Sequence, residues 1–164
     1  MKKLKAAALA LTLLASNSIY AAYGIVDIER VIDQSSYLKQ QNAALQQQIK
    51  PQSTQLETLG KQLQQIQQNA QNGAKLSDAE KKKLAAEYQE KMQKFNTLQQ
   101  SVQNTVKTNI QQMNKTMDSR IKQVAEQLRQ ENKLEGVLNK NSALAYDAKL
   151  DLTDKMIQKV NAIK

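Results

Sequence analysis

The order of the segments constrains the fold of this chain most strongly. After the first 21 residues, a short apolar run with strand character lies at 23–28. About a hundred residues rich in Gln and Lys follow, with the apolar spacing of long amphipathic helices. Two more short apolar runs, at 134–139 and 143–147, then read as strands. The chain therefore leaves a small β module along one helix and returns to it along another.

The first 21 residues have the pattern of a cleavable export signal. Lysines precede an apolar stretch at 6–15 that is too short to span a bilayer. We expect cleavage after Ala21, and cleavage after Ser18 or Ala22 is the alternative. An uncleaved membrane anchor is a less favoured interpretation. The mature chain is therefore predicted to be soluble and to act outside the cytoplasm.

The composition excludes most catalytic chemistry. The chain has no Cys and no His, so it cannot form disulfides, thiolate or imidazole nucleophiles, or the usual zinc and copper sites. It has four glycines and contains neither a Walker nor a dinucleotide-binding fingerprint. We therefore predict that the protein is not an enzyme, with no catalytic residues, no metal site and no cofactor.

The charge favours anionic partners. Removal of the signal lowers the net charge from +9 to +6, because it removes Lys2, Lys3 and Lys5 and no acid. A positive surface suits lipid headgroups, lipopolysaccharide or acidic client proteins. Nucleic acid is not expected, because the chain is exported and few aromatic residues are available for stacking on bases. A solvated helix surface with a modest basic excess remains the alternative interpretation.

Local signals mark the start of the first long helix. A helical turn or two is expected over 29–34, after which Ser35 or Ser36 offers an N-cap. Pro51 lies inside this helix, where it removes one backbone hydrogen bond and clashes with the preceding turn. The sequence therefore predicts a kink in this helix at Pro51.

The tip of a helical hairpin is predicted at 72–76. Gly73 is a candidate left-handed helix stop, and Ser77 with Glu80 forms a capping box that opens the second helix. This helix extends to about residue 131. Large apolar side chains are sparse between residues 66 and 84, so weak packing and a mobile tip are expected there.

The chain ends with a return to the β module. Residues 140–142 are expected to form a turn between the strands at 134–139 and 143–147. Thr153 is the expected N-cap of a closing helix. This β module comprises 22–34 and 134–164, about 44 residues, which rarely suffices for an independent core. Its open strand edges must also be covered.

Several copies of such a module closed into one shared barrel would solve both problems. The helical arms, residues 35–133, would then project from the barrel side by side. The residues predicted to assemble the barrel are Ile25, Val26, Val137, Leu138, Leu144 and Tyr146.

Three segments together resemble one known family. They are AYGIVDIERVI, KLSDAEKKKLAAEYQEKMQKF and NKLEGVLNKNSALAYDAKLDLTDKMIQKVN. In this order they resemble the Skp/OmpH family of periplasmic chaperones across the mature chain. The resemblance implies an α+β, mostly α fold: a homotrimer with a small β-barrel body and long α-helical hairpin (coiled-coil) tentacles. It also implies ATP-independent holding of unfolded outer-membrane proteins in the Gram-negative periplasm, before delivery to the outer-membrane insertion machinery.

Candidate contact residues follow from this mechanism. Flexible and aromatic side chains in the arms can touch unfolded chains without selecting one sequence. The predicted client-binding residues are Tyr88, Met92, Phe95, Met113 and Met117. The alternative is that they hold the two arm helices together.

A lysine cluster at the tip is the second candidate surface, and it would contact anionic lipid, lipopolysaccharide or acidic clients. Its members are Lys75, Lys81, Lys82 and Lys83. The alternative is a solvated, net-positive tip. A structural or adaptor protein of the cell envelope, with one fixed partner and no protection of unfolded clients, is the alternative function.

Overall fold

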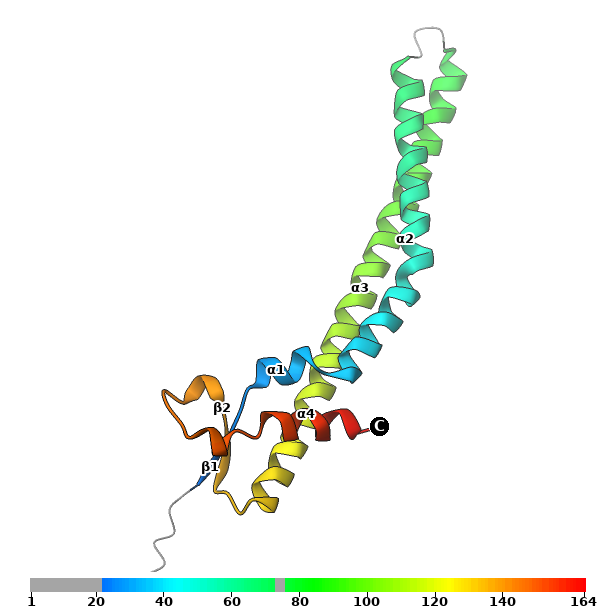
Figure 1. Ribbon diagram of the computed structural model, residues 1–164. Coiled ribbons are helices and arrows are strands. Elements are labelled where there is room, and N and C mark those ends of the chain that lie inside the picture. The colour runs from blue at the N-terminus through cyan, green and yellow to red at the C-terminus, as the bar shows by residue number, and fades with distance from the viewer. Residues whose placement is uncertain (1–21, 73–75) are drawn as a thin grey trace, which may run out of the picture.

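The computed structural model describes residues 22–72 and 76–164, so the predicted signal, Gly73 and Lys75 lie outside the described residues. The described chain is mostly helical, with one small sheet. A long helical hairpin stands out from a small body at its base (Figure 1). The elements are β1 (Tyr23–Val26), α1 (Ile28–Asp33), α2 (Ser36–Gln71), α3 (Asp78–Glu131), β2 (Gly136–Asn139), the 3-10 helices η1 (Lys140–Ser142) and η2 (Ala148–Leu150), and α4 (Thr153–Ala162).

The starts of both arm helices are capped as the sequence predicted. The Ser35 side chain accepts a hydrogen bond from the Leu38 N–H and begins α2. Ser77 and Glu80 form a reciprocal capping box at the start of α3. The Ser77 hydroxyl and backbone N–H both donate to the Glu80 carboxylate, and they lower the pKa of that side chain. These local hydrogen bonds fix where each helix begins.

The helix is not broken at Pro51, and the predicted kink stays a prediction. Helix α2 runs without a break from Ser36 to Gln71 and includes Pro51. A proline inside a long helix forfeits one backbone hydrogen bond, but the flanking turns and the packing against α3 keep the helix intact. The arm curves gently along its length (Figure 1).

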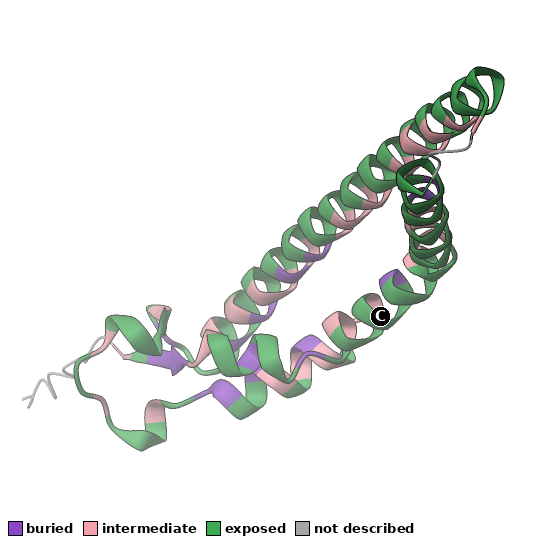
Figure 2. Cartoon of the chain, turned by 90° about the horizontal axis from the view of Figure 1, so that it is seen from above, coloured by how far each residue is buried: buried purple, intermediate pink, exposed green. Residues whose placement is uncertain are grey.

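Burial along the arm is uneven. The buried residues of α3 all lie near its base, and none lies between residues 78 and 112. On the other helix, Leu63 and Ile66 are buried toward the tip. Figure 2 shows most of the buried residues where the lower arm meets the body. The seam is therefore thin toward the tip, as the sparse apolar residues there predicted.

The body has its own small core. Strands β1 and β2 pair in parallel, with Tyr23 opposite Gly136 and Val26 opposite Asn139. Helix α4 crosses the base of α3 (Figure 1). The fully buried apolar side chains that join these elements are Val26, Val31, Val124, Leu128, Met156 and Val160. The base of the arm is thus part of the core of the body.

The predicted third strand is wrong. Residues 140–142 form η1, and no strand is present at 143–147. The side chains of Asn139 and Asp147 accept backbone hydrogen bonds two residues on, which starts 3-10 turns in place of an extended chain. The free edge of β1 is taken by a bridge between Ile25 and Asp151. The segment therefore has no edge of β1 on which to pair.

The predicted N-cap of the closing helix is also wrong, by one residue. Leu152 occupies the cap position, and Thr153 is the first residue of α4. The Thr153 hydroxyl accepts a hydrogen bond from the backbone N–H of Asp27, at 2.9 Å. The Thr153 hydroxyl therefore bonds to a residue distant in the sequence and does not cap the helix.

Candidate interaction surfaces

The two methionines near the base of the arm are buried. Met113 and Met117 are 6% and 4% exposed, and Met117 belongs to the core of the body. The Ser35 hydroxyl donates to the sulfur of Met117 at 3.6 Å. These positions favour the alternative that both methionines hold the arm helices together.

The other three predicted client-binding residues are half-buried. Tyr88 accepts a hydrogen bond from the Gln67 side chain of α2 at 2.9 Å. The Phe95 ring lies beside Gly60 of α2. Met92 lines a shallow surface groove on α3. Tyr88 and Phe95 therefore contribute to the seam, and all three also present part of their surface to solvent.

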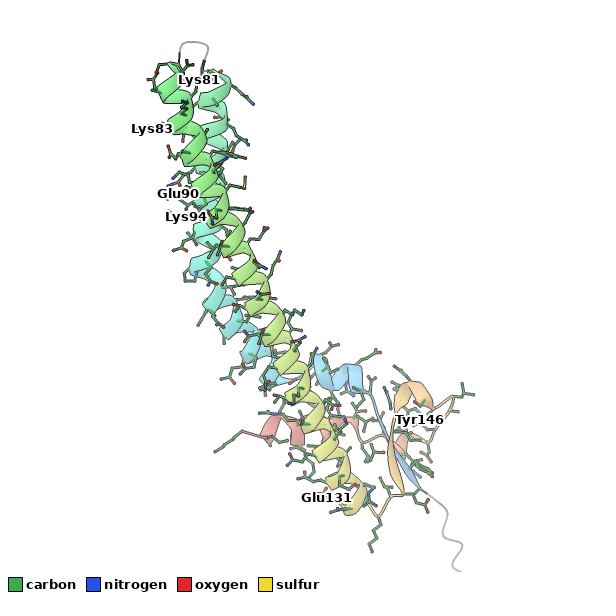
Figure 3. The ribbon with its side chains drawn as sticks, turned by 180° about the vertical axis from the view of Figure 1, so that it is seen from behind. Lys81, Lys83, Glu90, Lys94, Glu131 and Tyr146 are labelled. Carbon is green, nitrogen blue, oxygen red and sulfur yellow. The ribbon has the colours of Figure 1, made fainter. Side chains whose placement is uncertain are left out.

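A larger groove runs between α2 and α3 in the middle of the arm. Its volume is about 850 Å³, and threonine and glutamine side chains dominate its walls. Lys94 and Glu90 form an ion pair at its edge (Figure 3). Leu59 and Leu98 supply its main apolar surface. The groove is open, so it offers a contact surface along the arm and no enclosed binding site.

A second, apolar groove was not singled out by the sequence analysis. It lies along one side of α3 and has a volume of about 470 Å³. Val102, Val106 and Ile110 form its apolar wall, and Ile110 is 44% exposed. The signal in the sequence is the spacing of four residues, which places these three side chains on one side of the helix.

The tip carries exposed lysines and acids together. Lys81, Lys82 and Lys83 are all exposed, and Figure 3 shows Lys81 and Lys83 at the end of the arm far from the body. The amino group of Lys81 lies 3.9 Å from a carboxylate oxygen of Asp78. At this exposure such a pair contributes little to stability. The lysines are free to face solvent or an anionic surface.

The six predicted assembly residues divide into two groups. Ile25 and Val26 are buried in the core of the same chain, and Val137 packs against that core. Tyr146 is half-buried and donates to Asp151 at 3.4 Å. The remaining two, Leu138 and Leu144, are exposed, and Leu144 is fully so. Only these last two offer large apolar surfaces to another copy.

An ion pair and a side-chain hydrogen bond hold the loop that carries Leu144. The amino group of Lys140 lies 3.3 Å from a carboxylate oxygen of Asp27, and the side-chain amide of Asn141 donates a hydrogen bond to the carboxylate of Glu29 at 3.1 Å. The Arg30 backbone N–H and then Lys140 lower the pKa of Asp27, while Asp27 raises the pKa of Lys140. The start of the loop is therefore tied to α1, which leaves Leu144 projecting from the body.

Two further findings limit the chemistry of these surfaces. Within residues 22–72 and 76–164, no three side chains of the His, Cys, Asp or Glu type gather to hold a metal ion. No helix in the same ranges is long and apolar enough to cross a membrane. The described chain is thus a mostly helical α+β protein, with a long helical hairpin that carries open grooves on a small body.

Comparison with known proteins identifies the family. A family model described as outer membrane protein (OmpH-like) matches residues 22–160, and the chain belongs to this family. The chain is also 28% identical over 159 residues to a Skp-like protein of Chlamydia muridarum (strain MoPn / Nigg). That match covers 92% of this chain and 91% of the relative. The predicted membership of the Skp/OmpH family of chaperones is confirmed.

Proposed function

We propose that this chain is an ATP-independent holdase of the Gram-negative periplasm. It binds unfolded outer-membrane proteins between its arms and prevents their aggregation before they reach the outer-membrane insertion machinery. Family membership supports this function. The observation that carries it is the arm: α3 alone has 54 residues, roughly 80 Å, and none of its residues between 78 and 112 is buried. A surface of this length can hold a chain by many weak contacts.

The holdase assembles as a homotrimer through the body, 22–34 and 134–164. The arm, 35–133, stays free beyond its base, which packs into the core of the body. Support comes from the exposed Leu144 and from Leu138, which is 40% exposed. The sheet has only two strands, so β2 has an open edge within the described part of the chain. Exposed apolar side chains beside an open strand edge are the features that another copy would cover.

Replacing Leu144 with Asp tests the trimer. This side chain is fully exposed in the single chain, so the charge does not disturb the chain's own core. We expect sedimentation at micromolar concentration to give three times the protomer mass for the parent and a smaller mass for Leu144→Asp, because the charge would be buried in the interface. Asn114→Asp, on the exposed arm, is the matched control. A monomeric parent would refute the trimer.

Light scattering from a diluted, unfolded outer-membrane protein tests the holdase activity. The mature protein is expected to suppress scattering to the same extent with and without nucleotide or chelator. Suppression that requires either addition would contradict the proposal. A protein that instead gives no protection and copurifies with one partner at fixed stoichiometry would be an envelope adaptor.

The lysines at the tip are proposed to contact anionic lipid or lipopolysaccharide. Binding to vesicles that contain anionic phospholipid should weaken when Lys81, Lys82 and Lys83 are replaced by Gln, and it should weaken with salt. If the parent and the variant bind the vesicles equally well, these lysines do not contact lipid, and the tip is simply solvated.

A further inference from the structure

The apolar groove on α3 lies in a part of the arm that carries no acid. Residues 36–56 of α2 and 98–117 of α3 contain no Asp or Glu. The two segments lie side by side, because Ser35 contacts Met117 at one end and Gly60 lies beside Phe95 just past the other. The cations of this sector are Lys39, Lys50, Lys107 and Lys115. We call these two segments the acid-free sector.

The groove itself joins apolar and cationic groups. Val102, Val106 and Ile110 recur every four residues, so they line one side of α3 at intervals of about 6 Å. Lys107 lies at the edge of the groove, with Gln103 and Gln111 beside it. The groove therefore presents an aliphatic stripe flanked by one positive charge and amide groups.

We propose that this groove binds extended segments of unfolded proteins in which apolar residues alternate with acidic or polar ones. This inference rests on the proposed holdase function and names the part of the arm that takes the client. In an extended chain, side chains on one face recur at about 6.7 Å. That interval is close to the spacing of the aliphatic stripe, so successive apolar side chains of the client meet Val102, Val106 and Ile110.

The charge of the sector selects the occupant. A second copy that docks through the same sector would bring lysines against lysines with no acid to compensate, and like charges at close range repel. An acidic extended segment is instead attracted to the sector, because its carboxylates face Lys107. The glutamine amides can both donate to and accept from its unpaired backbone. These contacts are weak and do not depend on one sequence.

Binding of a labelled peptide to the full mature protein tests the proposal. The probe is a nine-residue peptide that alternates valine with aspartate, compared with a peptide of the same composition whose valines are contiguous. The double variant Val106→Gln with Ile110→Gln should bind the alternating peptide about tenfold more weakly, because it loses two aliphatic contacts. The matched control places the same two glutamines at Asn104 and Thr108, which are exposed and lie outside the groove lining. Its affinity should equal that of the parent.

A photo-crosslinker gives an independent measurement. At Gln103, which lines the groove, it should capture the peptide; at the adjacent Asn104, about 100° around the helix, it should not. Equal capture at both positions, or unchanged affinity of the double variant, overturns the proposal. Capture of a second copy, or loss of the peptide to anionic vesicles that occupy the groove, overturns it too. If the groove does not bind the peptide but the parent protein still suppresses client aggregation, only the groove proposal is refuted. If the parent protein does not suppress aggregation, the proposed holdase function is refuted.

Discussion

Two glycines offer a sharp test of the packing, because replacement by Ala should shift stability in opposite directions. Gly24 lies in β1, where an added Cβ would be 2.5 Å from the Cδ1 atom of Leu152 and 2.9 Å from that of Leu134. Both leucines are buried, at 6% and 8% exposure, so they have little room to move aside. Gly60 lies inside α2, where the nearest atom to an added Cβ is a ring carbon of Phe95 at 4.0 Å.

The magnitudes follow from these distances. Overpacking a filled core costs about 1–3 kcal/mol, which is the expected destabilisation for Gly24→Ala. Alanine inside a helix is more stable than glycine by about 1 kcal/mol, and at 4.0 Å the new methyl group only gains contact. Gly60→Ala should therefore stabilise the arm by about that amount. The two variants should differ by about 2–4 kcal/mol, although each adds one methyl group.

Urea denaturation followed by circular dichroism measures both variants, at one protomer concentration because assembly would make stability depend on concentration. Hydrogen exchange should slow around residue 60 in Gly60→Ala, and it should quicken in β1 and β2 in Gly24→Ala. Unchanged stability of Gly24→Ala would show that the leucines yield freely. A destabilised Gly60→Ala would show that the arm helices need the close approach that glycine allows.

Three further predictions concern the arm and its base. Pro51→Ala should stabilise α2 by up to about 3 kcal/mol and stiffen the arm, and it should leave the proposed trimer intact. If bending of the arm lets the protein hold large clients, this variant should protect them less well, and undiminished protection would contradict that role. Asn161→Ala should lower the free energy of unfolding by about 1–2 kcal/mol, because the Asn161 side chain accepts hydrogen bonds from the backbone N–H and the hydroxyl of Ser36. Hydrogen exchange at the Ser36 amide should become faster, and an unchanged exchange rate would refute this prediction. Hydrogen bonds from Arg129, and then from Gln130, lower the pKa of Glu126 to about 2. The stability that ionised Glu126 contributes is therefore present above pH 4.5 and is lost as the pH falls toward 2. Glu126→Gln should reduce the acid sensitivity of the melting temperature in that range, and an identical pH profile would contradict it.

The sequence alone predicted the arm well. The Ser35 cap and the capping box at Ser77 are formed as expected, and the sparse burial toward the tip follows the sparse apolar residues there. These features depend on residues three or four positions apart, which meet within one turn of a helix. Composition also limited the chemistry, since a chain without Cys or His lacks the side chains that most catalytic and metal sites use.

The tertiary structure decided the details of the body and the exposure of each arm residue. The run at 143–147 has strand composition, but the side chains of Asn139 and Asp147 start 3-10 turns on both sides of it, and Ile25 of β1 bridges Asp151 instead. Thr153 has capping chemistry, but its hydroxyl bonds to Asp27. Met117 and Ile110 both fit the helical repeat, yet one is buried and the other is 44% exposed. Each outcome depends on which distant residues meet in space, and a local pattern of residues does not contain that information.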